Sequence, residues 1–413
     1  MKVQRLRSIP GIAHLSLEAR HQPSGSGARF NGSGLAFAEY VARNRDMLRN
    51  AHSVAGAADL EKIVNGNAPF ELKPPAGFPA GINKTHRRGV LLTHGLSDSP
   101  YSMRHLAAFF QQNGFRVMAI LLPGHGTQPG DLLEVSWQEW AKTLAYGVDK
   151  LADEVDEVYL AGYSIGGALS VYQSLSDSRV RGLLLFSPAF KITHWAALAN
   201  LHKLYSWLIP SAKWVDIMPD RDIYKYESFT KNAAAQTHAL TKELGVQLQQ
   251  HELDIPVFTA ASEDDVTVKI SATLEFMARV RHPSSKLVVY STAPEKLPSG
   301  FGGRTVSELA GAGKLEVVNS VIPEQKILSS AHTAIVMPPE DAHYGVAGEY
   351  SNCVHYYSED KEKYAVCINN PSADFQGELT EKNLEAGILR RLMYNPNFAA
   401  LKVSMQRFID ALP

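Results

Sequence analysis

The chain has 413 residues, a formal net charge of -1 and charged side chains at 20% of its positions. This balanced charge gives no indication of nucleic acid or an anionic membrane surface as a partner. The length suits one large domain with insertions, or two domains, with a sizeable core. Because no apolar run approaches the roughly 20 residues that a spanning helix needs, we expect no stable membrane insertion.

The first part of the chain, residues 1–70, is predicted to be an N-terminal extension that is loose at first and then helical. Residues 1 to about 34 are rich in Gly, Ser and Arg, which disfavours regular structure. Over residues 35–64 the apolar residues recur at helical spacing, with Phe37 and Leu48 near one face.

Residues 71–190 are predicted to form the first part of an α/β core, because strand and helix patterns alternate along them. Helices are expected where apolar positions recur at helical spacing, at residues 99–114, 136–151 and 165–175. Strands are expected at the apolar runs of residues 88–95, 115–126, 155–164 and 179–190. Continuous apolar strands separated by helices indicate a mostly parallel sheet that is covered by helices on both faces.

The alternation stops after Phe190 and resumes at about residue 254. Residues 191–250 are helical in pattern and aromatic, and we interpret them as a helical cap. Residues 251–413 are predicted to form the second part of the core. They begin with a strand, a helix and a strand, at residues 254–268, 269–282 and 284–292. A Gly- and Pro-rich insertion then follows at about 292–326.

The segment Gly162-Tyr163-Ser164-Ile165-Gly166 stands where a predicted strand gives way to a predicted helix. It fits the Gly-x-Ser-x-Gly pattern of a nucleophile elbow, a turn so tight that its flanking positions tolerate almost no side chain. Such a turn strains the serine and exposes its oxygen at the N-terminus of a helix, where developing negative charge is favoured. We therefore predict that Ser164 is a catalytic nucleophile.

A serine hydroxyl needs a base to remove its proton and an acid to orient that base. His332 in "SSAHTAIV" is the preferred base and His343 in "EDAHYG" the rival. Asp264 is the preferred acid, in the local pattern Ala-x-x-Asp-x-Val. The adjacent Asp265 is the alternative, since the two carboxylates leave the strand end in different directions.

The oxyanion of the tetrahedral intermediate needs hydrogen-bond donors. The turn His94-Gly95-Leu96 ends an early strand, so the backbone N–H of Leu96 is one predicted donor and that of Ile165 the other. His94 precedes a turn glycine, which indicates a structural role. The chain order Ser164, Asp264, His332 is that of the α/β-hydrolase fold and not of the chymotrypsin or subtilisin type.

These segments resemble α/β-hydrolases of the monoacylglycerol lipase, lysophospholipase and carboxylesterase branch. The resemblance covers roughly residues 86–336 and depends most on "LAGYSIGGAL" and "LLPGHG". It implies an α/β-hydrolase fold, a Ser-His-Asp ester hydrolase without a cofactor, and the same roles for Ser164, Asp264, His332, Leu96 and Ile165. The interval between Asp264 and His332 is longer than in small members of the family, and the chain after Ile335 has no recognised counterpart.

The expected reaction is hydrolysis of medium to long acyl esters, such as monoacylglycerol or lysophospholipid. The aromatic content of the predicted cap favours an acyl-chain pocket, with Trp195, Trp207 and Trp214 as candidate substrate contacts. The alternative is that those side chains only pack the cap against the core. Acyl transfer, thioester or amide cleavage on the same fold is the alternative, and a catalytically inactive ligand-binding homologue is the further rival. The expected partner is a small-molecule ester; the oligomeric state is not predicted.

The chain has two cysteines, Cys353 and Cys367, which flank a pattern of strand, charged turn and strand. A hairpin there would allow a disulfide in an oxidising compartment, and two free thiols are the alternative. No metal site is expected, because no further cysteine or tight histidine cluster completes a ligand set. The location is expected to be cytoplasmic, or periplasmic or secreted if a leader was removed and the cysteines pair.

Overall fold

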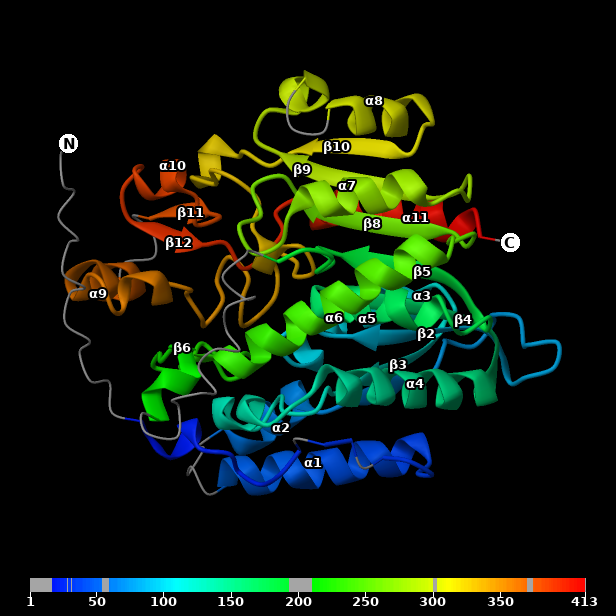
Figure 1. Ribbon diagram of the computed structural model, residues 1–413, viewed down its shortest axis with the longest axis horizontal. Coiled ribbons are helices and arrows are strands. Elements are labelled where there is room, and N and C mark those ends of the chain that lie inside the picture. Colours follow the sequence, from blue (N-terminus) through cyan, green and yellow to red (C-terminus); the bar gives the residue numbers. More distant parts are fainter. Residues whose placement is uncertain are drawn as a thin grey trace.

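The computed structural model of this protein describes residues 17–27, 29–30, 32–53, 59–192, 210–299, 303–369 and 374–412. An eight-stranded sheet forms its centre (Figure 1). In spatial order the strands are β1 (Phe70–Leu72), β3 (Arg116–Ile120), β2 (His86–Thr93), β4 (Val155–Tyr163), β5 (Val180–Phe186), β8 (Val257–Ser262), β9 (Lys286–Ser291) and β10 (Leu315–Asn319). β1 pairs antiparallel with β3, and the other neighbouring strands pair parallel.

The structure confirms the predicted α/β-hydrolase fold, with helices on both faces of the sheet. Alternate residues of a strand point to opposite faces, so Leu91 of β2 packs in one hydrophobic cluster and Leu92 in the other. The first face is covered by α4 (Trp137–Glu154), α5 (Ile165–Ser174), α6 (Lys231–Gln250) and α7 (Ile270–Arg279). The second face is covered by α3 (Arg104–Gln112) and α11 (Phe398–Asp410).

The N-terminal extension is more tightly packed than the sequence predicts. Its helices are α1 (Phe37–Ser53) and α2 (Leu60–Asn67), and the Tyr40 hydroxyl of α1 donates to the Leu121 carbonyl at 2.9 Å. The earlier stretch, predicted to be loose, contains the 3₁₀ helix η1 (Ala19–His21), whose His21 is buried. Ser24 is anchored to the Asp131 carboxylate, so the prediction is wrong for this stretch.

The described part of the predicted cap, residues 191–192 and 210–250, is only partly helical. It contains η5 (Pro210–Lys213), the antiparallel pair of β6 (Trp214–Asp216) and β7 (Phe229–Thr230), and then α6. The Thr230 side chain caps α6 by accepting the backbone N–H of Ala233. Two earlier 3₁₀ helices lie in the core, η2 (Pro100–Met103) and η3 (Pro129–Leu133).

The predicted insertion at 292–326 contributes a strand that extends the sheet. It contains η6 (Pro294–Ser299), α8 (Gly303–Gly311), β10 and η7 (Pro323–Gln325), and β10 pairs parallel with β9 at the sheet edge. The strand Leu315–Asn319 is short, and the Gly and Pro residues around it concealed its pattern in the sequence.

The C-terminal segment also differs from its predicted hairpin. η8 (His332–Ala334) is followed by η9 (Val354–Tyr356), α9 (Lys361–Asn369), β11 (Phe375–Gly377), α10 (Glu381–Leu384) and β12 (Leu389–Arg391), and β11 pairs parallel with β12. Cys353 and Cys367 form a disulfide that joins the start of η9 to α9. We call residues 352–369 and 374–392 the C-terminal module; in Figure 1 its α9, β11 and β12 lie together at one end of the sheet, opposite the C-terminus.

Candidate active site

The turn around Ser164 has the strained geometry that the sequence predicts. β4 ends at Tyr163 and α5 begins at Ile165, and Ser164 between them has φ 54° and ψ -115°. A Cβ on Gly162 would lie 2.2 Å from the Gly166 carbonyl oxygen. A Cβ on Gly166 would lie 2.2 Å from the Thr93 carbonyl oxygen of β2. Only glycine therefore fits on either side of this serine, whose left-handed backbone is held in place by the packing around it.

The structure brings Ser164 and His332 together. The Ser164 hydroxyl lies 3.1 Å from His332 Nε2, and His332 Nδ1 lies 2.6 Å from Asp265 Oδ2. In the tautomer that carries its proton on Nδ1, the ring donates to the carboxylate and accepts from the serine. The side chains of His332 and Asp265 are only 6% and 1% exposed, so the hydrogen bond between them is shielded from water.

The acid in this arrangement is Asp265, which corrects the preference for Asp264. Asp265 Oδ1 accepts the backbone N–H groups of Thr267 at 2.8 Å and Val268 at 2.9 Å, which turns the other oxygen toward His332. Asp264 leaves the strand in another direction, and among the described residues its Oδ2 has no hydrogen-bond partner. Burial, followed by the charges of Glu263 and Glu378, raises the pKa of Asp264 to about 7.

The two predicted oxyanion donors both line the cavity beside Ser164. Leu96 lies in the loop after β2, and Ile165 is the first residue of α5, where backbone N–H groups have no acceptor within the helix. His94 has the structural role that was predicted: its Nε2 accepts the Leu122 N–H at 3.0 Å, and its Nδ1 lies 2.8 Å from the Gly95 oxygen. Burial lowers the pKa of His94 well below its usual value, so this ring is neutral.

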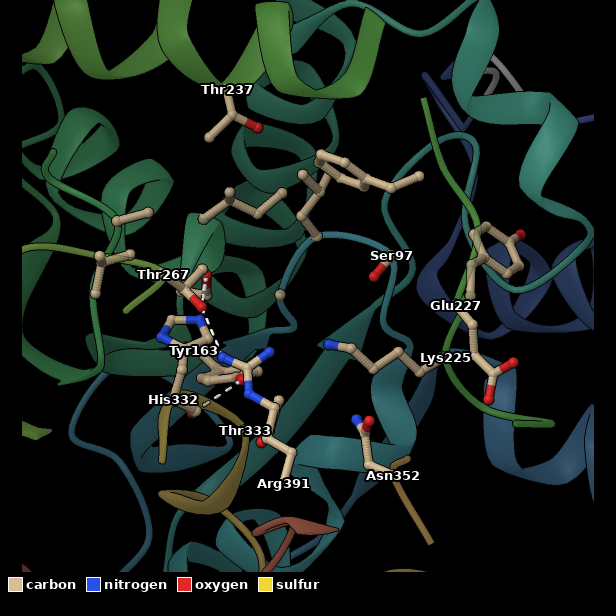
Figure 2. Close-up of a pocket in the computed structure, with 18 of the residues that line it drawn as sticks. Ser97, Tyr163, Lys225, Glu227, Thr237, Thr267, His332, Thr333, Asn352 and Arg391 are labelled. Carbon is tan, nitrogen blue, oxygen red and sulfur yellow. Dashed lines mark hydrogen bonds between the residues drawn. The ribbon is translucent and has the colours of Figure 1, made fainter. Parts of the chain in front are cut away.

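A cavity of about 350 Å³ opens onto Ser164 and His332. Its apolar wall includes Ile192, Phe229 and Val268. Its polar residues include Lys225, Glu227, Asn352 and Arg391. Figure 2 shows the Lys225 and Arg391 side chains directed toward the middle of the cavity.

The charges around the cavity are partly compensated by buried partners. Burial raises the pKa of Asp98 to about 6, and the nearby Lys225 ammonium opposes this rise. Burial also raises the pKa of Glu227, whose carboxylate accepts the Tyr350 hydroxyl at 2.7 Å. The polar wall therefore carries both a cation and carboxyl groups.

Two other candidates from the sequence, Trp214 and His343, do not contact Ser164. Trp214 is buried against His21, with ring centroids 5.1 Å apart, and it is not among the residues that line the cavity. Its predicted substrate contact is therefore wrong, because β6 turns its ring toward the N-terminal segment. Trp195 and Trp207 lie outside the described residues. His343, the rival base, is bound to Asp222 at 3.0 Å and does not contact Ser164.

The described parts of the chain contain neither a metal-ligand cluster nor a membrane-spanning helix. They contain no group of three or more His, Cys, Asp or Glu side chains arranged to hold a metal ion. Within those same ranges, no helix has the length and apolar character needed to cross a bilayer.

The chain matches one family model and is similar to two bacterial hydrolases over part of its length. A family model described as "Serine aminopeptidase, S33" matches residues 84–294. A thermostable monoacylglycerol lipase from Bacillus sp. (strain H-257) is 31% identical over 109 residues, 26% of this chain and 44% of the relative. A carboxylesterase from Bacillus subtilis (strain 168) is 28% identical over 85 residues, 20% of this chain and 35% of the relative. The chain thus aligns with less than half the length of these relatives.

Among solved structures, the chain is similar to a metagenome-derived lipolytic enzyme, with 20% identity and a TM-score of 0.45 over 60% of this chain and 98% of the other. It is also similar to the monoacylglycerol lipase of Paleococcus ferrophilus, with 16% identity and a TM-score of 0.42 over 54% of this chain and 88% of the other.

Proposed function

Because the chain belongs to the family described as serine aminopeptidase, S33, we propose that it is a serine hydrolase that cleaves carboxylic esters. The observation that carries this proposal is the pair of hydrogen bonds that links Ser164 to His332 and His332 to Asp265. In this arrangement His332 is the base, and Asp265 holds the ring in the tautomer that accepts the serine proton.

The proposed reaction begins when Ser164 Oγ attacks the ester carbonyl carbon and transfers its proton to His332 Nε2. The carbonyl oxygen becomes an oxyanion beside the backbone N–H groups of Leu96 and Ile165, which are positioned to donate to it. His332 then gives the proton to the departing alcohol, which leaves an acyl group on Ser164. Water attacks that acyl-enzyme, with His332 again as the base, and the acid is released.

The proposed substrates are medium to long acyl esters with one polar head group, such as monoacylglycerol or lysophospholipid. The curated relatives named monoacylglycerol lipase and carboxylesterase support ester substrates. The cavity supports a substrate of mixed polarity, because its wall at Phe229 and Val268 is apolar whereas Lys225 and Asn352 offer polar contacts.

The experiment for this proposal is hydrolysis of p-nitrophenyl esters of increasing chain length, followed by monoacylglycerol and lysophospholipid of the preferred length. We expect ester turnover that Ser164→Ala abolishes while the circular dichroism spectrum is retained. Turnover that survives in Ser164→Ala would contradict the proposal, as would a folded wild type that hydrolyses no ester with detergent present. Products formed with added alcohol acceptors or from thioesters separate the alternative transferase and thioesterase activities.

The second candidate is cleavage of an amide next to a free amine. It is supported by the family description and by the carboxyl groups of Asp222 and Glu227, which line the cavity and could bind an ammonium group. Lys225 on the same wall opposes an amine ligand. The kcat/KM values for aminoacyl p-nitroanilides and for the matching acyl esters decide between ester hydrolysis and amide cleavage. An aminopeptidase should have the higher kcat/KM for the p-nitroanilides.

A further inference from the structure

The C-terminal module, which lies beyond the residues matched by the family model, reaches directly behind His332. Its Glu378 is buried with no exposed surface, and its Arg391 lines the cavity. We propose that Glu378, paired with Arg391, is a positioning residue that fixes His332 and Asp265 in their reactive geometry. This inference rests on the proposed roles of Ser164, His332 and Asp265.

Glu378 holds the backbone of the histidine. Its Oε2 accepts the backbone N–H of His332 at 2.9 Å, and its own backbone N–H donates to Ser329 Oγ at 3.0 Å. On the other side of the same residue, the Tyr163 hydroxyl donates to the His332 carbonyl at 3.1 Å. Both backbone groups of His332 are therefore fixed by side chains, one from the C-terminal module and one from the serine turn.

Arg391 connects Glu378 to the loop that carries the acid. Its Nε donates to Glu378 Oε1 at 2.8 Å, and its Nη2 donates to Glu378 Oε2 at 3.1 Å and to Thr267 Oγ1 at 2.8 Å. The backbone N–H of Thr267 in turn donates to the Asp265 carboxylate at 2.8 Å. A continuous set of hydrogen bonds thus runs from the backbone of His332 through Glu378, Arg391 and Thr267 to Asp265, which binds the ring of the same histidine.

Glu378 and Arg391 also neutralise each other's charge beside His332. Buried Glu378 carries its carboxylate beside the cationic Arg391, so the two together add no net charge near His332. Among the described residues, the other ionisable groups near this corner include Asp265, on the ring of His332, and Tyr163, whose ring centroid lies 5.4 Å from that of His332. They also include Asp264, which is affected by the charge of Glu378, and the partly buried His355, which is affected by the charge of Arg391. Removal of either member of the pair leaves an uncompensated charge in a buried site.

The same two strands supply a matched control. Asp374 precedes β11 and accepts from Arg390 of β12 at 2.7 Å, and both side chains are buried. This pair contacts Cys367 of α9 rather than His332. Asp374→Asn therefore breaks a buried Arg–carboxylate pair of the same module without touching the candidate site.

The test compares Glu378→Gln, Arg391→Met and Asp374→Asn by ester kinetics and by the rate of inactivation with a fluorophosphonate. We expect Glu378→Gln to lower kcat and the inactivation rate by about 100-fold with little change in KM, because small misplacements of a base cost about that much. Asp374→Asn is expected to lower the melting temperature comparably while its inactivation rate stays within about 3-fold of wild type.

The pH profile gives a readout that loss of structure alone would not produce. Glu378→Gln leaves Arg391 unbalanced, which disfavours protonated His332 and moves the acidic limb of the kcat/KM profile to lower pH. Arg391→Met leaves a buried carboxylate and moves that limb to higher pH. Opposite shifts in the two variants are the expected result, and Asp374→Asn should shift neither way.

The inference is overturned if a folded Glu378→Gln reacts with the fluorophosphonate as fast as wild type, or if both variants shift the limb in one direction. If Glu378→Gln does not fold, Thr267→Val decides by the same rates: about 10-fold slower inactivation supports the inference and a wild-type rate overturns it. A wild type that shows no adduct on Ser164 contradicts the proposed function itself, so the two failures are distinguishable.

Discussion

Ser164 is positioned by its immediate neighbours, whereas His332 is positioned by Glu378, which lies 46 residues further along the chain. At the serine, Gly162 and Gly166 leave no room for any other backbone path. At the histidine, the hydrogen bonds come from β4 and from the C-terminal module. The serine half of the candidate site thus depends on a local glycine motif packed against β2, and the histidine half depends on side chains from distant segments.

This difference distinguishes the part of the candidate site that lies in the shared core from the part that the C-terminal module contributes. The serine turn lies within the residues matched by the family model, whereas Glu378 and Arg391 lie outside them. The sequence around His332 does not predict the contact with Glu378, because the two residues meet only in the folded chain. Each of the following predictions tests one side of this comparison.

The largest expected effect separates two adjacent carboxylates. Asp265→Asn should lower kcat by about 10⁴-fold, because an amide there stabilises the wrong tautomer of His332. Asp264→Asn should stay within about 3-fold of wild type, because Asp264 does not bind His332. Steady-state ester kinetics on both variants check this prediction. Equal losses in the two variants would show that the acid has been assigned to the wrong residue.

A methyl group beside the serine should be the most damaging change to the fold. Gly166→Ala places a Cβ 2.2 Å from a backbone oxygen of β2, so we expect a loss of about 3 kcal/mol in the free energy of unfolding, measured by urea titration. The control is Gly245→Ala in α6, where a Cβ meets nothing within 4 Å and should stabilise by about 0.5–1 kcal/mol. A Gly166→Ala protein as stable as wild type would contradict the steric account.

In the C-terminal module, which contacts His332, the disulfide should contribute to the free energy of unfolding by an amount similar to or smaller than the loss predicted for Gly166→Ala. Cys353 and Cys367 are 14 residues apart, and closing a loop of that size stabilises by about 3 kcal/mol in the chain-entropy account. The double variant Cys353→Ser, Cys367→Ser should therefore unfold at lower urea concentration, with fluorophosphonate reactivity lost earlier in the titration than core structure. The control is urea unfolding of the wild type with and without reductant. Identical unfolding curves under the two conditions would refute the prediction.

The smallest expected effect is a pH dependence at Asp264. Burial raises its pKa from 3.8 to about 7, so the folded protein holds this proton more tightly than the unfolded chain does. Stability from this group is therefore lost as pH rises from 3.8 to about 7. Asp264→Asn should be more stable than wild type by on the order of 1 kcal/mol above pH 7, once solvent screening is included. A stability difference that does not change between pH 5 and pH 8 would argue against this.

The sequence predicted strands β2, β3, β4, β5, β8 and β9, the helices α3, α4, α5 and α7, and Ser164 and His332 as partners, because each depends on a local pattern of apolar spacing or on a glycine turn. It preferred Asp264 to Asp265, because adjacent residues share one motif and only the folded turn decides which oxygen reaches the ring. It also missed β10, whose short apolar run lies among Gly and Pro residues.

The largest gap concerned the C-terminal module. The cysteines were predicted to flank a hairpin, whereas Cys353 precedes η9 and Cys367 lies within helix α9. Glu378 and Arg391 carried no sequence signal at all, because their importance lies in contacts with His332 and Thr267, far from them in the chain.

The most direct test of the central claim is peptide mapping of the fluorophosphonate adduct on wild type, Asp264→Asn and Asp265→Asn. The account predicts one adduct, on Ser164, formed at similar rates in wild type and Asp264→Asn and far more slowly in Asp265→Asn. An adduct on another residue, or equal rates in all three proteins, would contradict a reactive serine whose histidine is held by Asp265.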